Sequence, residues 1–309
     1  KMVGRGRHML RVLSIALLAL ACAVPARADA VANCDQSADP ARAIAGCSEL
    51  IRENPRNIGA FYNRAIAHHT RGEYDRAIAD YTSAIDLDPK NANAYNNRGV
   101  AYAAKGNNDL AIADYTKAIS LNPKFANAYS NRGVAYERNN DYARAIADHN
   151  KAIALNPNDP DFYTNRGIAH RGKGDLARAL ADYTRAIEIN PRLANAHNNR
   201  GNIHRDKGDY ARAIEDYTRA IEIDPNLAVA YANRGWALFA TGKIELALQD
   251  VERALLLRPD NADALDTRGH IYEKLGRRQE AIADFRRALA REPTLQSSSN
   301  GLKRLGAEP

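Results

Sequence analysis

The sequence has few residues of the kinds that usually carry chemistry. It holds three cysteines, eight histidines and one tryptophan among 309 residues. No group of His, Cys and acidic residues has the spacing of a metal site, and no nucleophile elbow or phosphate-binding loop is present. We therefore expect no enzymatic activity, no metal and no cofactor.

Long hydrophobic runs are also scarce, and the one that stands out lies near the start. Residues 1–11 are basic, Val12 to Val24 are apolar, and small residues at alternate positions follow. The run is too short to cross a bilayer comfortably. This pattern predicts a secretory signal peptide over residues 1–30, cleaved after Ala28 or Ala30, with a retained anchor as the alternative. We expect a periplasmic or secreted protein with no membrane insertion after cleavage.

The basic excess of the chain is concentrated in the same segment. The whole sequence has 44 Lys and Arg against 37 Asp and Glu, but residues 1–30 contain five of the bases and one acid. Residues 31–309 thus carry 39 basic and 36 acidic side chains, without a Lys/Arg tract that alternates with aromatics. This balance predicts no nucleic-acid partner.

Most of the remaining chain is one repeated unit. Proline recurs every 34 residues, and with this proline counted as position 32 the seven units are 58–91, 92–125, 126–159, 160–193, 194–227, 228–261 and 262–295. A fixed period of this length is typical of a solenoid, in which each repeat packs on its neighbours.

Each unit is predicted to form two helices, over positions 1–14 and 17–30. Position 15 is Gly in six units and Asn140 in the other, which indicates a left-handed turn residue. Proline at position 32 cannot continue the second helix. Ala at positions 20 and 27 faces Gly or Ala at position 8, so the two backbones can approach closely. The fold class predicted is all-α, an α-solenoid of seven helix-turn-helix repeats with an N-terminal half repeat.

These residues resemble the tetratricopeptide repeat family. The pattern is an aromatic at positions 4, 11 and 24, Gly or Ala at 8, Ala at 20 and 27, and Pro at 32, with Asn-Arg-Gly at 6–8 as in bacterial exported members. The resemblance implies a right-handed superhelix whose first helices line an inner groove for a protein or peptide. Several units depart from the pattern, with His68, His170, His204 and Leu238 at position 11 and His149 and Val251 at position 24.

Short segments flank the repeats. Residues 31–57 are predicted to form an arm and a half repeat whose one helix covers 39–54, and residues 296–309 a C-terminal cap or tail. Cys34 and Cys47 lie in the N-terminal segment. An even pair of cysteines in an oxidising compartment predicts a disulfide, with two free thiols as the alternative.

Arginine occupies position 7 and aspartate position 23 in all seven units. Position 7 lies on the buried arc of the first helix, where an unpaired guanidinium would be costly. We expect each arginine to pair with the aspartate of the facing helix, although a row of ligand-binding arginines is the alternative. The structural ion pairs singled out are Arg98–Asp114, Arg132–Asp148 and Arg166–Asp182.

Asparagine occupies position 6 in six units, on the arc expected to face the groove. Its amide can donate and accept hydrogen bonds, which suits the backbone of an extended peptide. The row resembles the asparagine ladder of O-linked N-acetylglucosamine transferases and import receptors; alternatively the amides are solvated or help neighbouring helices pack. The candidate binding residues are Asn63, Asn97, Asn131, Asn165, Asn199 and Asn233.

The sixth unit adds an apolar patch with the only tryptophan, Trp236, together with Phe239. Exposed apolar patches usually mark contacts, so we predict a non-catalytic interaction scaffold that binds an extended peptide or partner protein. The alternative is a homo-oligomer that assembles through the Trp236 region. The family's clamp for C-terminal carboxylates uses Lys at positions 2 and 5, where this chain mostly has Asn, Asp, Ser, Thr or apolar residues.

Overall fold

The computed structural model describes residues 28–35 and 38–308. Within these residues every regular element is a helix, which confirms the predicted all-α solenoid of helical hairpins. The chain divides into two compact units, with the boundary between Leu155 and Asn156.

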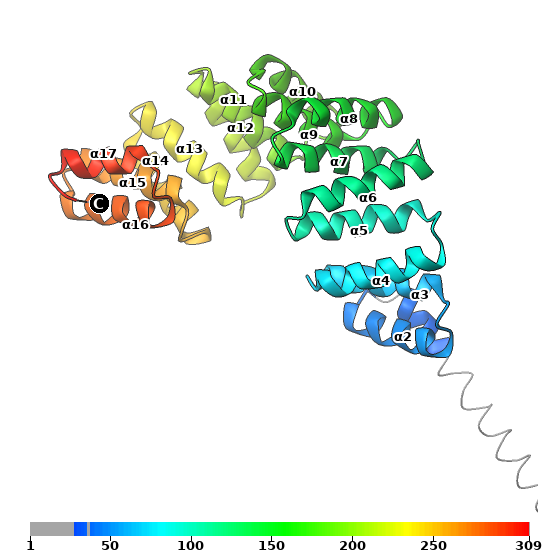
Figure 1. The fold of residues 1–309 in the computed structure, drawn as a ribbon. Coiled ribbons are helices and arrows are strands. Elements are labelled where there is room, and N and C mark those ends of the chain that lie inside the picture. Colours follow the sequence, from blue (N-terminus) through cyan, green and yellow to red (C-terminus); the bar gives the residue numbers. More distant parts are fainter. Residues whose placement is uncertain (1–27, 36–37, 309) are drawn as a thin grey trace, which may run out of the picture. The chain divides into compact units, whose positions relative to one another are not determined.

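In the first unit the hairpins stack in chain order (Figure 1). Its helices are α2 (Pro40–Glu53), α3 (Ile58–Thr70), α4 (Tyr74–Leu87), α5 (Ala92–Ala104), α6 (Asn108–Leu121), α7 (Ala126–Arg138) and α8 (Tyr142–Leu155).

The second unit repeats this plan and ends in a short extra helix. Its helices are α9 (Pro160–Gly172), α10 (Leu176–Ile189), α11 (Ala194–Asp206), α12 (Tyr210–Ile223), α13 (Ala228–Ala240), α14 (Ile244–Leu257), α15 (Ala262–Lys274), α16 (Arg278–Arg291) and α17 (Gln296–Arg304). The second helices of the repeats cover positions 17–30 as predicted, whereas the first helices end at position 13, one residue early.

Small residues hold the two helices of each hairpin close together. The alanines at positions 20 and 27, such as Ala111 and Ala118, have no exposed surface. The glycine at position 8 lies under the ring at position 24, because a Cβ added to Gly99 would be only 2.7 Å from Tyr115 Cε1. In five of the seven repeats the core is therefore a ring packed on bare backbone; the first has Ala65 in place of the glycine and the sixth has Val251 in place of the ring.

The turn between the helices needs a left-handed residue, as the sequence predicts. Gly106 has a φ of 80°, and Asn140, which replaces glycine in the third repeat, has a φ of 59°. Asparagine tolerates this region better than other residues with a side chain. At the start of the next hairpin, several first helices are capped by asparagine; the Asn91 side chain, for example, accepts a hydrogen bond from the Ala94 amide at 3.0 Å.

The ends of the array differ in how they are covered. Residues 28–35, which span the end of the predicted signal peptide and the start of the predicted arm, are helical, and Ala30 and Cys34 are buried with Leu50 of α2. At the other end, Leu302 of α17 is fully buried beside Phe285. The signal peptide predicted for residues 1–30 lies, up to residue 27, outside the described residues.

Candidate binding site

The arginines at position 7 bind the aspartates at position 23 in all seven repeats. In the third repeat, Arg132 Nε donates to Asp148 Oδ2 at 2.7 Å and its Nη2 donates to Oδ1 at 2.8 Å. The Asp148 hydrogen bond raises the pKa of Arg132. The same bidentate geometry joins Arg64–Asp80, Arg98–Asp114, Arg166–Asp182, Arg200–Asp216, Arg234–Asp250 and Arg268–Asp284. The row therefore links the two helices of each hairpin.

The remaining nitrogen of several of these arginines reaches the preceding repeat. Arg98 Nη1 donates to Thr82 Oγ1 at 3.0 Å, and the same 3.0 Å contact links Arg132 to Thr116 and Arg234 to Thr218. These hydroxyls lie at position 25 of the previous second helix. One guanidinium thus joins three helices, which is a structural role.

The asparagines at position 6 are half-buried, and Asn63, Asn97, Asn131 and Asn233 each donate a hydrogen bond. Asn131 Nδ2 donates to Asn96 Oδ1 at 3.0 Å, and Asn233 Nδ2 donates to Asn198 Oδ1 at 2.9 Å. Both acceptors lie at position 5 of the preceding first helix. Asn97 donates in the same way to Tyr62 Oη at 2.8 Å, and Asn63 donates to Asp35 of the N-terminal segment at 2.9 Å.

These contacts show that the amide row helps to align neighbouring first helices. Each of these four side chains donates one hydrogen bond, and the Oδ1 atoms of Asn97 and Asn233 also accept one, from Asn96 at 3.0 Å and from Arg205 at 3.4 Å. An amide has two donor hydrogens and an acceptor oxygen, so part of this capacity remains for a ligand. Asn165 and Asn199 occupy the same position in α9 and α11 and are likewise half-buried. The row is therefore both a packing device and a candidate binding surface.

Three first helices of the second unit enclose a hollow of about 520 Å³. Its volume is within the usual range for ligand pockets. The lining residues are Arg205 and Asp206 of α11, Ala232, Asn233 and Trp236 of α13, and Asp263, Asp266 and Thr267 of α15. Two of the predicted binding residues, Asn233 and Trp236, are thus brought to one cavity.

The aromatic residues of α13 have different surroundings. Trp236 is 37% exposed, with Tyr210 edge-on at 5.6 Å and the Arg205 guanidinium 5.8 Å from its ring. Phe239 does not line the hollow; it stacks on His270 at 6.3 Å and lies near the Lys274 ammonium. Trp236 is therefore the aromatic residue that the cavity presents.

The histidines in the aromatic position 11 are packed side chains. His170 and His204 each lie 3.9 Å from the aspartate of their own hairpin, Asp182 and Asp216. Burial lowers the pKa of both histidines. Among residues 28–35 and 38–308, no three His, Cys, Asp or Glu side chains are grouped so that they could hold a metal ion.

Models of the tetratricopeptide repeat match the sequence over most of the array. The matches cover residues 67–106, 101–140, 126–159, 160–193, 194–227, 216–249 and 262–295. The chain belongs to the tetratricopeptide repeat family. A comparison with curated proteins found no match.

Solved structures share the tetratricopeptide fold. A chain of the APC/C hetero-tetramer Cut9-Hcn1 aligns with a TM-score of 0.70 at 19% identity, over 86% of this chain and 53% of that chain. The present chain therefore spans about half the length of that relative. A tetratricopeptide repeat protein from Parabacteroides merdae aligns with a TM-score of 0.62 at 20% identity, over 84% of this chain and 98% of that chain. The structure of pilF of Pseudomonas aeruginosa aligns with a TM-score of 0.62 at 17% identity, over 69% of this chain and 97% of that chain.

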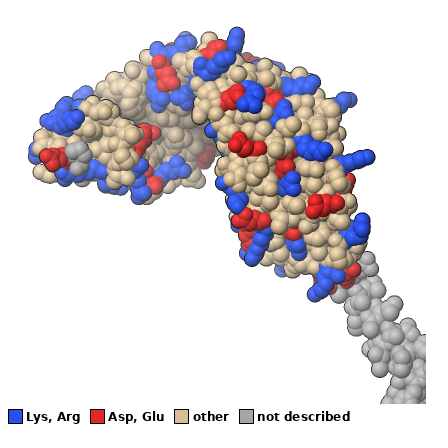
Figure 2. Space-filling model, in the orientation of Figure 1, with Lys and Arg blue, Asp and Glu red and all other residues tan. Residues whose placement is uncertain are grey.

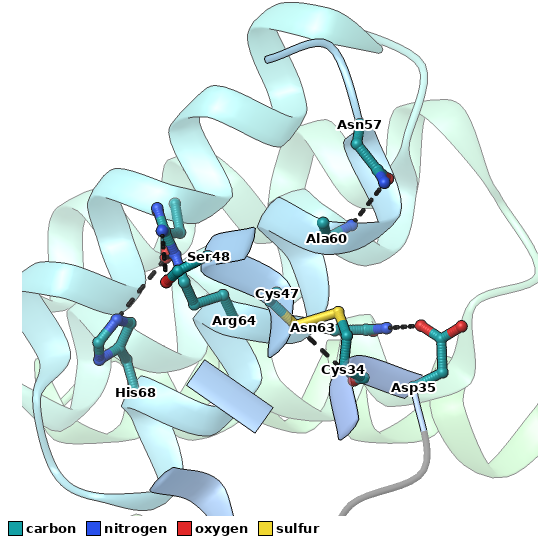
Figure 3. The surroundings of a disulfide bond; sticks show 10 residues. Cys34, Asp35, Cys47, Ser48, Asn57, Ala60, Asn63, Arg64 and His68 are labelled. Carbon is teal, nitrogen blue, oxygen red and sulfur yellow. Dashed lines mark hydrogen bonds and ion pairs between the residues drawn. A yellow bond between two sulfur atoms is a disulfide. The ribbon is translucent and has the colours of Figure 1, made fainter. Parts of the chain in front are cut away.

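A disulfide lies beside the first tetratricopeptide repeat. Cys34 and Cys47 are bonded, with their Cα atoms 4.7 Å apart, and both are buried (Figure 3). The bond joins the helical segment 28–35 to α2. Asp35, next to Cys34, accepts the hydrogen bond from Asn63 of α3. The N-terminal segment is thus attached both to the half repeat and to the first complete repeat.

The acidic walls of the hollow were missed by the sequence interpretation. Asp263 and Asp266 lie at positions 2 and 5 of the last repeat, and Asp206 at position 13 of the fifth. The clustering of these three carboxylates in one hollow with the tryptophan depends on how consecutive hairpins pack, which the sequence spacing does not specify. Separately, no helix within the described ranges has the length and apolar character that a membrane span requires.

Proposed function

We propose that this chain is a non-catalytic scaffold that holds an extended peptide or a partner protein against its first helices. The observation that carries the proposal is the hollow of the second unit, which combines an exposed tryptophan with amide and carboxylate groups from three helices. Aromatic anchors in such cavities dominate the energetics of many protein interfaces. Its repeats belong to a family of protein-interaction modules, which supports the same function.

We propose further that the chain is exported to the bacterial periplasm, or secreted, by a cleaved signal peptide. The basic and apolar segments of residues 1–24 and the bonded cysteines support this. Fusion of residues 1–57 to alkaline phosphatase should give an active periplasmic reporter, and N-terminal sequencing should identify the cleaved bond. An inactive fusion would contradict export.

Peptide capture can be tested by selecting binders from a library of random short peptides displayed on phage. Asn131→Ala should weaken the binding of a selected peptide, but it also removes the hydrogen bond to Asn96. Asn96→Ala is the matched control, because it removes the same bond from a side chain that is only 6% exposed. Equal affinities for the two variants would contradict a direct role for Asn131, and failure to select any binder would contradict the proposed function.

Self-association through the Trp236 region is the second candidate, favoured by the exposure of Trp236 and of Val229 on the same helix. Light scattering coupled to size exclusion separates the two. A monomeric wild type excludes self-association, whereas a dimer that Trp236→Ala converts to a monomer would support it.

A further inference from the structure

The hollow in the second unit is lined by more acidic than basic side chains. Its lining carries three carboxylates and one guanidinium. Arg205 Nη2 is 3.0 Å from Asp206 Oδ1, and Arg171 Nη2 is 3.3 Å from Asp206 Oδ2. Asp206 is therefore neutralised within the protein. Of the two aspartates of α15, Asp266 has His270 beside it and interacts electrostatically with Arg304, whereas Asp263 has no such partner among the described residues.

Asp263 and Asp266 lie three residues apart on α15, so their side chains share one face of the helix. Asp266 accepts a hydrogen bond from Ser298 at 2.6 Å, which fixes its carboxylate, and His270 is 3.7 Å away. Asp263 is exposed and forms no ion pair with any residue that the structure describes. A fixed carboxylate beside an unpaired one is a favourable site for a cation with several donors.

The opposite wall provides a complementary surface. The Trp236 indole packs edge-on against Tyr210. The guanidinium of Arg205 already lies 5.8 Å from the centre of the indole ring. Indole rings attract cations, and the flat guanidinium group also stacks on them. Asn233 and Thr267, which also line the hollow, are anchored to Asn198 and to the Asp263 carbonyl. The site is thus formed before a ligand enters.

We propose that this hollow binds an arginine side chain of an extended peptide, with the guanidinium on Asp263 and Asp266 and its stem along Trp236. The inference rests on the proposed function, since it names the residue that the scaffold selects. Arginine fits better than lysine because its planar fork can bind two carboxylates and stack on the indole together. Charge complementarity excludes an acidic segment as the occupant.

The single tryptophan gives a direct readout of this site. Short peptides of glycine and serine with one central arginine, lysine, citrulline or glutamate are titrated into the full chain while its fluorescence is recorded. We expect a saturable change with the arginine peptide, about tenfold weaker binding for citrulline, its uncharged isostere, and no response with glutamate. Raising the salt concentration should weaken the binding of the arginine peptide.

Asp263→Asn should lower the affinity for the arginine peptide about tenfold. Asp161→Asn is the matched control, because Asp161 is exposed at position 2 of α9 and does not line the hollow. Equal binding of arginine and citrulline peptides, no saturable response, or an unchanged affinity in Asp263→Asn would each overturn the inference. If display selects binders while the arginine peptide gives no saturable response, the scaffold function stands and only this site is refuted.

Discussion

At the scale of single residues, the position-7 arginines are the main polar contacts of the structure. Each binds an aspartate that is at most 10% exposed, while the arginines themselves are 17–23% exposed. Desolvating such a pair is costly, but the bidentate geometry satisfies both groups. Removing one partner is therefore worse than removing both.

We expect Arg132→Met to lower the free energy of unfolding by about 2–4 kcal/mol, because it leaves Asp148 buried without its partner. Urea denaturation measures the loss. Arg144→Ala is the matched control, since its ion pair with Asp141 is 65% exposed on the arginine side and contributes little to stability. Similar losses in the two variants would show that burial does not set the cost.

The buried histidines make the stability of the second unit depend on pH. Burial lowers the pKa of His170 and His204 below the ordinary value of 6.5. As the pH falls, these histidines bind protons in the unfolded chain at a higher pH than in the folded chain. Their contribution to the free energy of unfolding is therefore fully present above about pH 6.5 and is lost as the pH falls toward their lowered pKa in the folded state.

Replacing both histidines by tyrosine, the residue at this position in Tyr102, Tyr136 and Tyr272, should reduce the loss of stability on acidification. Urea midpoints compared at about pH 7.5 and pH 5.5 provide the test. An unchanged difference between the two midpoints in the double variant would assign the pH dependence to other groups.

At the scale of elements, the caps decide how the array ends, because a terminal hairpin exposes an apolar face that the next repeat would otherwise cover. Helix α17 covers the last hairpin with Leu302, and the helical segment 28–35 covers α2.

Leu302→Ala should destabilise the second unit by about 2–4 kcal/mol, since it opens a cavity against Phe285. Leu256, which is 72% exposed on α14, provides the control, and its replacement by alanine should have an effect within about 0.5 kcal/mol. If circular dichroism melts of Leu302→Ala and wild type coincide, α17 does not act as a cap.

Reduction of the Cys34–Cys47 bond should destabilise the N-terminal end by about 2–3 kcal/mol, because the bond closes a loop with a sequence separation of 13 residues in the unfolded chain. Hydrogen exchange should speed up first in residues 28–35 and α2. The Cys34→Ser/Cys47→Ser variant is the control, as its exchange should not respond to the reductant. Equal hydrogen-exchange rates in these residues of the reduced and the oxidised wild type would contradict a stabilising role of the disulfide.

At the scale of the whole molecule, the sequence predicted the fold because its period is repeated seven times. Each helix, turn and stop recurs in phase, so local signals reinforce one another. The partners of the asparagine row were not predictable in the same way. Whether Asn131 meets Asn96 or solvent depends on the rotation between consecutive hairpins, which a 34-residue spacing does not specify.

The helical segment 28–35 was missed for a different reason. Its first three residues belong to the predicted signal peptide and the rest to the predicted arm, and all of them fall outside the repeat period. Ala30 and Cys34 are four residues apart and both buried, a helical spacing too short to distinguish from an arm. Their burial depends on Gly46 of α2, where a Cβ would lie 2.6 Å from the Ala30 carbonyl oxygen.

The distribution of charge predicts weak affinity for nucleic acid. Lys/Arg and Asp/Glu are interspersed over the visible face of the unit that ends at Leu155 (Figure 2). We expect a labelled single-stranded oligonucleotide to remain unbound by the full chain at about 0.15 M salt in fluorescence anisotropy. Saturable binding at that salt concentration would contradict the prediction.

The arginine that links several hairpins to their predecessors also bears on how such arrays lengthen. Its partners lie at fixed sequence offsets, 16 residues ahead to the aspartate and 16 behind to the hydroxyl. If a second copy of residues 92–125 were inserted after Phe125, Arg132 would bind the Thr116 hydroxyl of the new copy. The Arg98 of the new copy would bind the Thr116 hydroxyl of the original unit. Duplication of this unit in steps of one period would therefore add a hairpin while Arg98 and Arg132 keep both their aspartate and their hydroxyl partners.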